Sequence, residues 1–231
     1  MDNWHPPEAL TYIRNNRDAF AAERFDAEYF HPAKRQAIAD LSALSDCTVG
    51  DLFSPIRDLW QPGDGKPTNL VRNYDLTDAL SPFLDASKEP VERGMIASTK
   101  KRIAHGDLVV SRLRSYLREI ALVQPADHIP TVASTEFIVL RPRSSCTLPV
   151  EALLVYLRSP LPQVIFKWSQ DGSNHPRFDE KELLRLPVPR ALIDEAHEYV
   201  RLIKAMSEGR EKAAKLLAAA KRAVALAIED S

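Results

Sequence analysis

The last forty residues constrain the fold of this chain more than any other stretch. After Pro189 there is no further proline, and Gly209 is the only glycine. From Leu192 to Ile228, mostly apolar or small residues recur with heptad spacing, the pattern of a helix that packs against another helix. The core positions of this heptad pattern are Leu192, Ala196, Tyr199, Ile203, Met206, Arg210, Ala213, Leu217, Ala220, Val224 and Ala227.

The heptad pattern predicts one helix of nearly forty residues, roughly 55–60 Å long at 1.5 Å per residue. Such a helix cannot bury its apolar stripe against a small domain, so we expect it to have a partner helix. The pairs Glu208–Lys212 and Glu211–Lys215, each four residues apart, favour a continuous helix. The alternative is a helix that folds back on itself at Gly209, since glycine often interrupts helices.

The first 190 residues predict a mixed α and β domain. Helical patterns cover Glu8–Glu23 and, after a break, the residues up to about Leu44. From Val49 to Pro90, Pro, Asp, Ser and Gly separate short apolar runs, as in irregular β structure with long loops. Three runs rich in Val, Ile and Leu then predict strands: Leu108–Leu113, Ile120–Val123 and Glu136–Leu140.

Helices are expected again beyond the third strand. One begins at Pro149 and ends at Arg158, another covers about Pro162 to Trp168, and a short one covers Glu180–Leu184. Asp179 and Glu182 have the spacing of a capping box at the start of the short helix. We therefore predict an α+β chain: a helical segment at 1–45 that packs on a mixed α/β domain at 46–190, followed by a long coiled-coil helix at 191–231.

Charge is distributed unevenly along the chain, although the formal net charge is only −1. Residues 1–92 carry 9 Lys and Arg against 16 Asp and Glu, and residues 93–190 carry 15 against 9. Only the middle segment, with a balance of +6, could present a positive face to phosphates. A solvated basic surface without a partner remains the alternative.

Composition and the lack of targeting signals lead us to expect a cytosolic protein. The chain contains no apolar run near the roughly 20 residues of a membrane span. Its start, Met1-Asp2-Asn3-Trp4-His5-Pro6-Pro7, is acidic and rich in proline, unlike a secretory or transit signal. Cys47 and Cys146 suit a reducing compartment, with a single disulfide as the open alternative.

Motifs of catalysis are missing from the sequence. The seven glycines form no phosphate-binding array, and the only Pro-Pro pair, Pro6-Pro7, lacks the flanking residues of an amino-methyltransferase motif. Histidines and cysteines show no metal-ligand spacing, and no G-x-S-x-G accompanies Ser, His and Asp. Asp179-Glu180-Lys181 has the residue types of a nuclease centre, but acidic residues in a first helical turn explain it more simply. We expect no enzyme activity, no metal and no cofactor.

Two stretches are rich in side chains that could contact DNA. If 108–114 is a strand, Arg112 and Arg114 lie on one face of it, where two guanidinium groups can bind phosphates or guanine. The second stretch is the loop over residues 169–177, Ser-Gln-Asp-Gly-Ser-Asn-His-Pro-Arg, which is dense in donors and acceptors. Each stretch alone also fits an ordinary polar surface.

The order of these pieces carries a resemblance. Seven pieces follow one another along the chain: Gly106-Asp107-Leu108-Val109-Val110-Ser111-Arg112-Leu113-Arg114, Ile120–Val123, Ser134–Pro142, Leu153–Pro160, the Gly172–Arg177 loop, Leu183–Pro189 and the long helix. From about Arg24 onward, this set resembles one target-recognition domain plus one spacer helix of the specificity subunits of type I restriction-modification systems. No single motif is specific, whereas the ordered set is.

The resemblance implies a recognition domain that reads half of a bipartite double-stranded DNA target. The long helix would pair antiparallel with a second one and dock a methyltransferase subunit that modifies adenine, with a restriction or motor subunit as a further partner. That methyltransferase uses S-adenosylmethionine, while a specificity subunit binds none. Since family members typically carry two recognition domains and two spacer helices, we expect a homodimer here.

The resemblance and the two polar stretches together give the site residues. Those expected at DNA are Lys100, Lys101, Arg102, Ser111, Arg112, Arg114, Ser134, Thr135, Lys167, Ser169, Ser173, Asn174, His175 and Arg177. Those expected at the dimer contact are Tyr199, Ile203, Met206, Arg210, Ala213, Leu217, Ala220, Val224 and Ala227. The competing hypothesis is a dimeric scaffold or antagonist in a DNA-defence system that binds protein rather than DNA.

Overall fold

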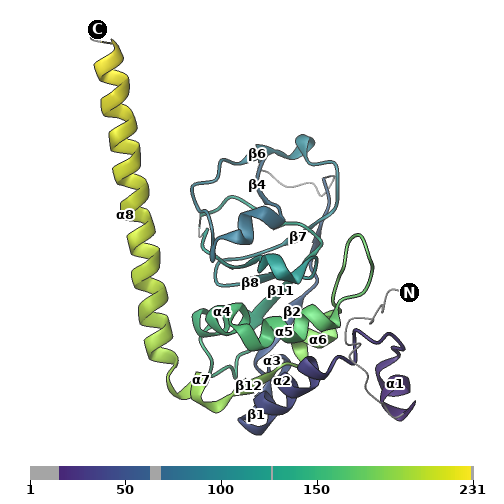
Figure 1. Cartoon of the computed structure of the whole chain (residues 1–231). Coiled ribbons are helices and arrows are strands. Elements are labelled where there is room, and N and C mark those ends of the chain that lie inside the picture. Colours follow the sequence, from purple (N-terminus) through teal and green to yellow (C-terminus); the bar gives the residue numbers. More distant parts are fainter. Residues whose placement is uncertain (1–15, 63–68, 126, 230–231) are drawn as a thin grey trace, which may run out of the picture.

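The computed structural model describes residues 16–62, 69–125 and 127–229. A mixed α and β domain is followed by one long helix, as the sequence predicts (Figure 1). The helices are α1 (Asn16–Ala22), α2 (Pro32–Ala43), α3 (Val49–Leu52), α4 (Val150–Arg158), α5 (Pro160–Ser169), α6 (Glu180–Leu184), α7 (Arg190–Asp194) and α8 (Ala196–Glu229). Short 3-10 turns are η1 (Leu76–Leu80), η2 (Arg93–Met95) and η3 (Ser115–Leu117).

The strands that the structure describes form three sheets. The first pairs β1 (Ser45–Thr48) with β12 (Pro187–Pro189). The second has the order β2 (Phe53–Ile56), β11 (Phe137–Pro142), β8 (Leu108–Ser111), β9 (Ile120–Val123), β5 (Phe83–Leu84). The third has the order β3 (Leu59–Trp60), β7 (Lys100–Arg102), β10 (Thr131–Ala133), β4 (Leu70–Tyr74), β6 (Val91–Glu92). The β5–β9 and β10–β4 pairs are parallel, and the others are antiparallel.

Strand β8 lies between β11 and β9 in the second sheet, and it is buried on both faces because a hydrophobic core lies on each side of the sheet. Side chains alternate between the faces of a strand. Leu108 and Val110 therefore point into one core, and Val109 points into another. The second core fills the space toward the third sheet, with Tyr74, Ala133 and their neighbours. An uninterrupted apolar run in the sequence is the expected signature of such a strand.

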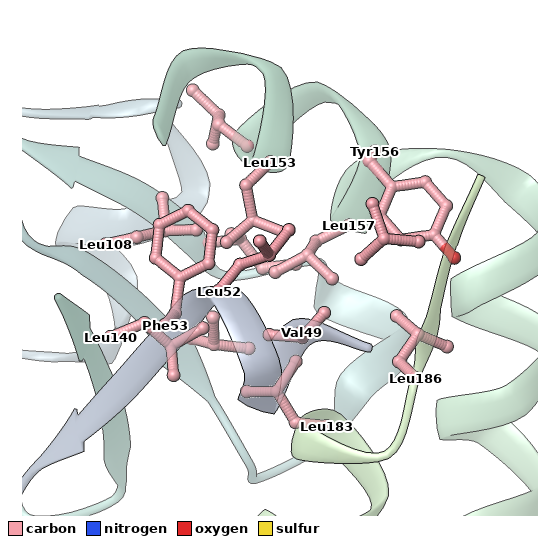
Figure 2. Close-up of a cluster of buried hydrophobic side chains, with 14 of the residues drawn as sticks. Val49, Leu52, Phe53, Leu108, Leu140, Leu153, Tyr156, Leu157, Leu183 and Leu186 are labelled. Atoms are coloured by element: carbon pink, nitrogen blue, oxygen red, sulfur yellow. The ribbon is translucent and has the colours of Figure 1, made fainter. Parts of the chain in front are cut away.

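The first core joins the second sheet to a layer of helices. Figure 2 shows Val49, Leu52 and Phe53 beside the sheet residues Leu108 and Leu140, with leucines of α4 and α6 closing over them. Ala37 and Leu41 of α2 belong to the same core. The domain thus has three layers, helices, sheet and sheet, seen from bottom to top in Figure 1.

Helix α8 has 34 residues and is continuous through Gly209, so the helix does not fold back there. The heptad pattern extends one turn further than α8 does, because Leu192 lies in α7 and the chain turns at Glu195. Tyr199 and Ile203 pack on the first core of their own domain, and Gln124 Nε2 donates to Ser207 Oγ at 2.8 Å. From residue 208 to residue 228 every side chain is exposed.

No described helix is both long and apolar enough to span a membrane.

One local expectation is corrected, and two others agree with the structure as far as it describes them. The strand over 108–114 ends at Ser111, and Arg114 takes a left-handed conformation with a φ of 48° before η3, so the period of two does not relate it to Arg112. Of the helix expected over Glu8–Glu23, α1 covers Asn16–Ala22, and residues 8–15 lie outside the described part. Cys47 and Cys146 are both free thiols.

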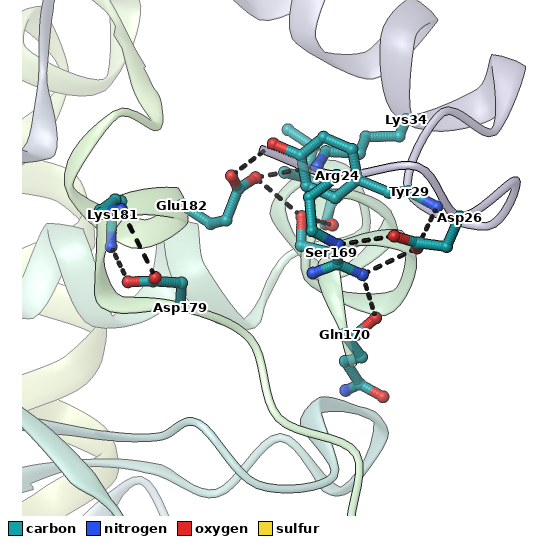
Figure 3. Close-up of polar contacts among 10 residues, drawn as sticks. Arg24, Asp26, Tyr29, Lys34, Ser169, Gln170, Asp179, Lys181 and Glu182 are labelled. Carbon is teal, nitrogen blue, oxygen red and sulfur yellow. Dashed lines mark hydrogen bonds and ion pairs between the residues drawn. The ribbon is translucent and has the colours of Figure 1, made fainter. Parts of the chain in front are cut away.

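The expected capping box at α6 is half present, because its carboxylate has other partners. Asp179 caps the helix by accepting from the backbone N–H of Lys181 at 3.0 Å. The carboxylate of Glu182 instead accepts from Lys34 Nζ at 2.8 Å, Tyr29 Oη at 2.8 Å and Ser169 Oγ at 2.9 Å (Figure 3). Burial alone would raise the pKa of Glu182, but the Lys34 charge and these three donors outweigh it and hold the pKa below its ordinary value.

The Lys34–Glu182 pair ties the N-terminal segment to the domain. Lys34 is 4% exposed, and its ammonium lies 3.4 Å from the centre of the Tyr29 ring. A buried charge left without its partner is costly, typically about 3–5 kcal/mol. We therefore expect Lys34→Ala and Glu182→Ala each to lower the free energy of unfolding by about that much, as measured by urea denaturation at neutral pH.

The double variant Lys34→Met, Glu182→Leu is the control for this prediction. It removes both charges and keeps most of the volume, so it should lose less stability than either single variant. In the wild type, the contribution of the Glu182 carboxylate is complete above the ordinary Glu pKa of 4.5. It should be lost as the pH falls through the lower pKa of the folded state. Single variants as stable as the wild type would contradict the assignment.

Candidate functional site

The loop between α5 and α6 is closed by a bridge at its base. Asp171 and Arg177 exchange backbone hydrogen bonds of 2.8 and 2.9 Å. Gly172 turns the chain with a φ of +91°, a conformation that favours glycine, and its N–H donates to Asp171 Oδ1 at 2.8 Å. Figure 1 shows the segment standing out from the domain next to α6. Its tip residues Ser173, Asn174 and His175 are exposed.

The residues after β8 run along this loop. Leu113 forms an isolated bridge with Arg177, the Arg114 N–H donates to the Pro176 carbonyl at 2.9 Å, and the Phe178 N–H donates to the Arg112 carbonyl at 3.1 Å. Arg114 Nη2 lies 3.3 Å from His175 Nδ1. The two stretches that the sequence singled out separately, 112–114 and 171–177, therefore form one surface.

Glu136 holds two arginines of this surface together. Its carboxylate accepts from Arg177 Nη2 at 2.7 Å and from Arg112 Nε at 3.0 Å. The hydrogen bonds from Arg177, followed by those from Arg112, hold the pKa of Glu136 below its ordinary value although burial opposes them. Both arginine side chains stay more than 40% exposed. They are thus fixed in position and still accessible.

A hollow of about 520 Å³ adjoins the two arginines. Its charged or ionisable lining side chains are Glu23, Arg24, Arg112, Asp171, His175, Arg177, Asp179 and Lys181. Four of these are cations and three are carboxylates, so the hollow is close to neutral and carries both signs of charge. Such a surface offers both donors and acceptors, which suits the edges of bases better than phosphates alone.

The basic run on β7 contributes less than its sequence indicates. Lys100 forms an ion pair with Asp75 at 3.1 Å, and Arg102 lies 3.5 Å from Asp58. Lys101 Nζ donates to the Phe137 carbonyl at 2.7 Å, and burial lowers its pKa. Because neighbouring residues of a strand face opposite sides, the three cations do not form one patch.

Two expected DNA contacts lie inside the protein. Ser111 is 4% exposed and donates to the Leu113 carbonyl at 3.0 Å. Ser169 is 1% exposed and donates to Ile165 and Glu182. Buried hydroxyls with internal partners cannot reach a ligand, so the structure removes both from the candidate surface. Ser134 is half-buried, and its Oγ accepts from the Glu136 N–H at 3.3 Å.

The remaining candidates are exposed. Thr135 lies next to Glu136, and Lys167 lies in the last turn of α5 with its ammonium 4.8 Å from the Trp168 ring centre. The structure also adds Glu136, which the sequence analysis did not select. Glu136 stands directly before the apolar start of β11, and the sequence contains no signal for its role, because its partners lie 24 and 41 residues away. Within the described ranges, no three His, Cys, Asp or Glu side chains gather as a metal site would require.

Comparisons with known proteins show which solved structures have a similar fold. No protein-family model and no curated protein matches the chain. A chain from a structural study of complex assembly and conformational transition of the type I R-M system is 23% identical, with a TM-score of 0.56 over 71% of this chain and 42% of that one. The HsdS subunit from Thermoanaerobacter tengcongensis is 21% identical, with a TM-score of 0.52 over 73% of this chain and 44% of its own.

At these identities the likeness shows a shared fold, and it confirms the resemblance to type I specificity subunits at that level. The chain spans less than half the length of both solved structures. It therefore corresponds in fold to one part of each of them.

Replacing Glu136 should make the surface more attractive to polyanions. Glu136→Gln removes the carboxylate that neutralises Arg112 and Arg177. We expect the variant to elute from heparin at higher salt than Glu89→Gln, which makes the same change of net charge at an exposed position. The lost ion pairs are part-exposed, so the stability cost should be about 1 kcal/mol or less each. Equal elution of the two variants would show that the arginines do not govern this surface.

Proposed function

We propose that this chain is a non-catalytic DNA-specificity subunit of a type I restriction-modification complex. It reads one half of a bipartite duplex target and works as a homodimer. It presents the target to an adenine methyltransferase subunit, and a restriction subunit can join the complex. The chain itself needs no cofactor, since S-adenosylmethionine binds to the methyltransferase.

The observation that carries this proposal is the meeting of Arg112 and Arg114 with the 171–177 loop. In a domain with the fold of specificity subunits, this surface combines the exposed Arg112 and the half-buried Arg114, both with partners within the chain, with amide, hydroxyl and imidazole groups. Arginine held in place by a carboxylate can bind guanine with both ends of its fork. The exposed loop tip adds contacts that vary in chemistry from residue to residue.

Dimerisation is supported by the face of α8 that its own domain leaves open. Tyr199, Ile203 and Arg210, which the sequence analysis expected at the dimer contact, face the chain's own domain instead. About a third of a turn away, a second heptad row of exposed residues extends along the helix. Its members are Leu202, Met206, Gly209, Ala213, Leu216, Ala220 and Ala223. Small residues let two helices approach closely, and a twofold axis would place two recognition domains at opposite ends of the pair.

A fluorescence-anisotropy titration with duplex DNA tests the proposal. Binding should weaken steeply as salt rises, because cations that contact phosphates release counterions. Selection from a random-sequence library should then yield inverted half-sites separated by a fixed gap. Neither methylation nor cleavage is expected of the purified chain with S-adenosylmethionine, ATP or Mg²⁺.

A protein-binding scaffold is the second candidate, favoured by the ion pairs that engage Lys100, Arg102, Arg112 and Arg177 within the chain. It predicts stable association with a methyltransferase or restriction subunit and no salt-dependent binding of DNA. The titration separates the two candidates, since DNA binding that weakens with salt excludes a purely protein-binding role.

Removing two arginines should weaken DNA binding specifically. For Arg112→Ala, Arg114→Ala we expect a loss of about 1–3 kcal/mol for each base contact, or a flatter salt dependence if the contacts are to phosphate. The matched control is Arg35→Ala, Arg190→Ala, which removes the same charge from the helical side of the domain. Unchanged affinity and unchanged salt dependence in the first variant would exclude this surface as the DNA contact.

Shortening α8 should shorten the gap between the half-sites. Deleting residues 217–223 removes one heptad of exposed helix and about 10 Å at 1.5 Å per residue, or roughly three base pairs at 3.4 Å each. The half-sites should stay the same, because the recognition domain is untouched. Library selection with both proteins measures the gap, and an unchanged gap would show that α8 does not set the spacing.

Charged substitutions on the open row of α8 test the proposed dimer contact, and matched substitutions elsewhere on the helix are the control. Ala213→Glu, Ala220→Glu places charges on the open row and should yield a monomer in analytical ultracentrifugation. Ala218→Glu, Ala225→Glu adds the same charges to exposed positions away from that row and should leave the dimer intact. A wild-type chain that sediments as a monomer would contradict the homodimer.

A further inference from the structure

The turn between β8 and β9 has a strained backbone. Arg114 and Arg118 flank η3, and both have left-handed conformations, with φ values of 48° and 53°. Among the described residues other than glycine, only Glu23 shares a positive φ with these two. Such conformations cost energy in side-chain-bearing residues and persist where the surrounding structure enforces them, often at functional positions.

The surrounding structure holds this turn firmly. The Leu117 N–H donates to Arg114 and the Arg118 N–H donates to Ser115, each at 2.9 Å. Ser115 is buried, and its hydroxyl accepts from the Gln170 side chain. The Arg114 N–H is bonded to the 171–177 loop, and α5 packs against η3. The turn is therefore a rigid part of the candidate DNA surface.

The rigid turn presents an aromatic and an aliphatic side chain to solvent. Tyr116 is 63% exposed and Leu117 is 39% exposed. Arg114 and Arg118 flank them in the chain, and Arg114 connects them to His175. An exposed tyrosine beside cations on a strained, fixed turn is suited to DNA, because its ring can stack on a base while the cations face phosphates.

We propose that the Arg114–Arg118 turn is a wedge: Tyr116 inserts at one base step of the bound duplex and stacks on a base, and Leu117 fills the space beside it. This inference rests on the proposed function and adds a way of recognition to it. Target choice would then depend partly on how easily that base step unstacks, in addition to direct contacts with base edges. A fixed turn suits this role, because a wedge that bends aside cannot separate stacked bases.

The experiment uses the dimeric full chain and duplexes recovered by the binding selection, with 2-aminopurine placed at successive positions of one half-site. In the wild type, fluorescence should rise at one step, where the base loses its stacking. Tyr116→Phe should keep both the signal and the affinity. Tyr116→Ala should abolish the signal and weaken binding about 5- to 150-fold, which corresponds to roughly 1–3 kcal/mol for one stacked base.

A second arm separates stacking from other effects of the mutation. An abasic site at the responsive position removes the base on which Tyr116 stacks. It should weaken binding by the wild type and leave the already weakened Tyr116→Ala variant nearly unchanged. Tyr116 is exposed, so its loss should not alter thermal unfolding, and a melting curve checks this.

The outcomes distinguish the wedge from the proposed function. Tyr116→Ala binding like the wild type, with the same fluorescence profile, would overturn the wedge and leave DNA recognition standing. A uniform profile in the wild type at all positions would do the same. A wild-type chain that binds no duplex at low salt would overturn both.

Discussion

The burial of β8 on both faces is the constraint on which the rest of the domain depends. Leu108 and Val110 close the core under the helices, and Val109 closes the core between the sheets. Hydrogen bonds to β11 and β9 also occupy both edges of the strand, so the chain can reach the surface only where the strand ends. The residue directly after this end is Arg112, so the first arginine of the candidate surface follows a fully buried strand.

Local sequence patterns predicted the helices and strands. They could not predict contacts between residues that are far apart in the sequence. The runs at β8, β9 and β11, the start of α4 directly after Pro149 and the length of α8 all follow from composition and periodicity. The left-handed Arg114 and the buried Ser169 could not be foreseen, because each depends on partners that the fold brings together. Glu182 is the clearest example, since its spacing predicted a cap while Lys34, 148 residues away, takes the carboxylate.

Charge counted along the chain overstated the cationic surface for the same reason. The balance of +6 over residues 93–190 is partly cancelled in space by carboxylates from both inside and outside that segment, as with Asp58, Asp75 and Glu136. What remains is a small number of oriented guanidinium groups. Orientation favours selective contacts, whereas a diffuse cationic field would favour indiscriminate ones.

The closed base of the 171–177 loop has a consequence for how the sequence of such a protein can evolve. The Asp171–Arg177 bridge and the bonds of Arg112 and Arg114 to the neighbouring backbone hold the loop through main-chain groups. The tip side chains between them carry little of the folding energy, since they are exposed. Substitutions at the tip should therefore have little effect on the stability of the rest of the domain. New preferences can arise there without each one first having to be compensated by a more stable domain.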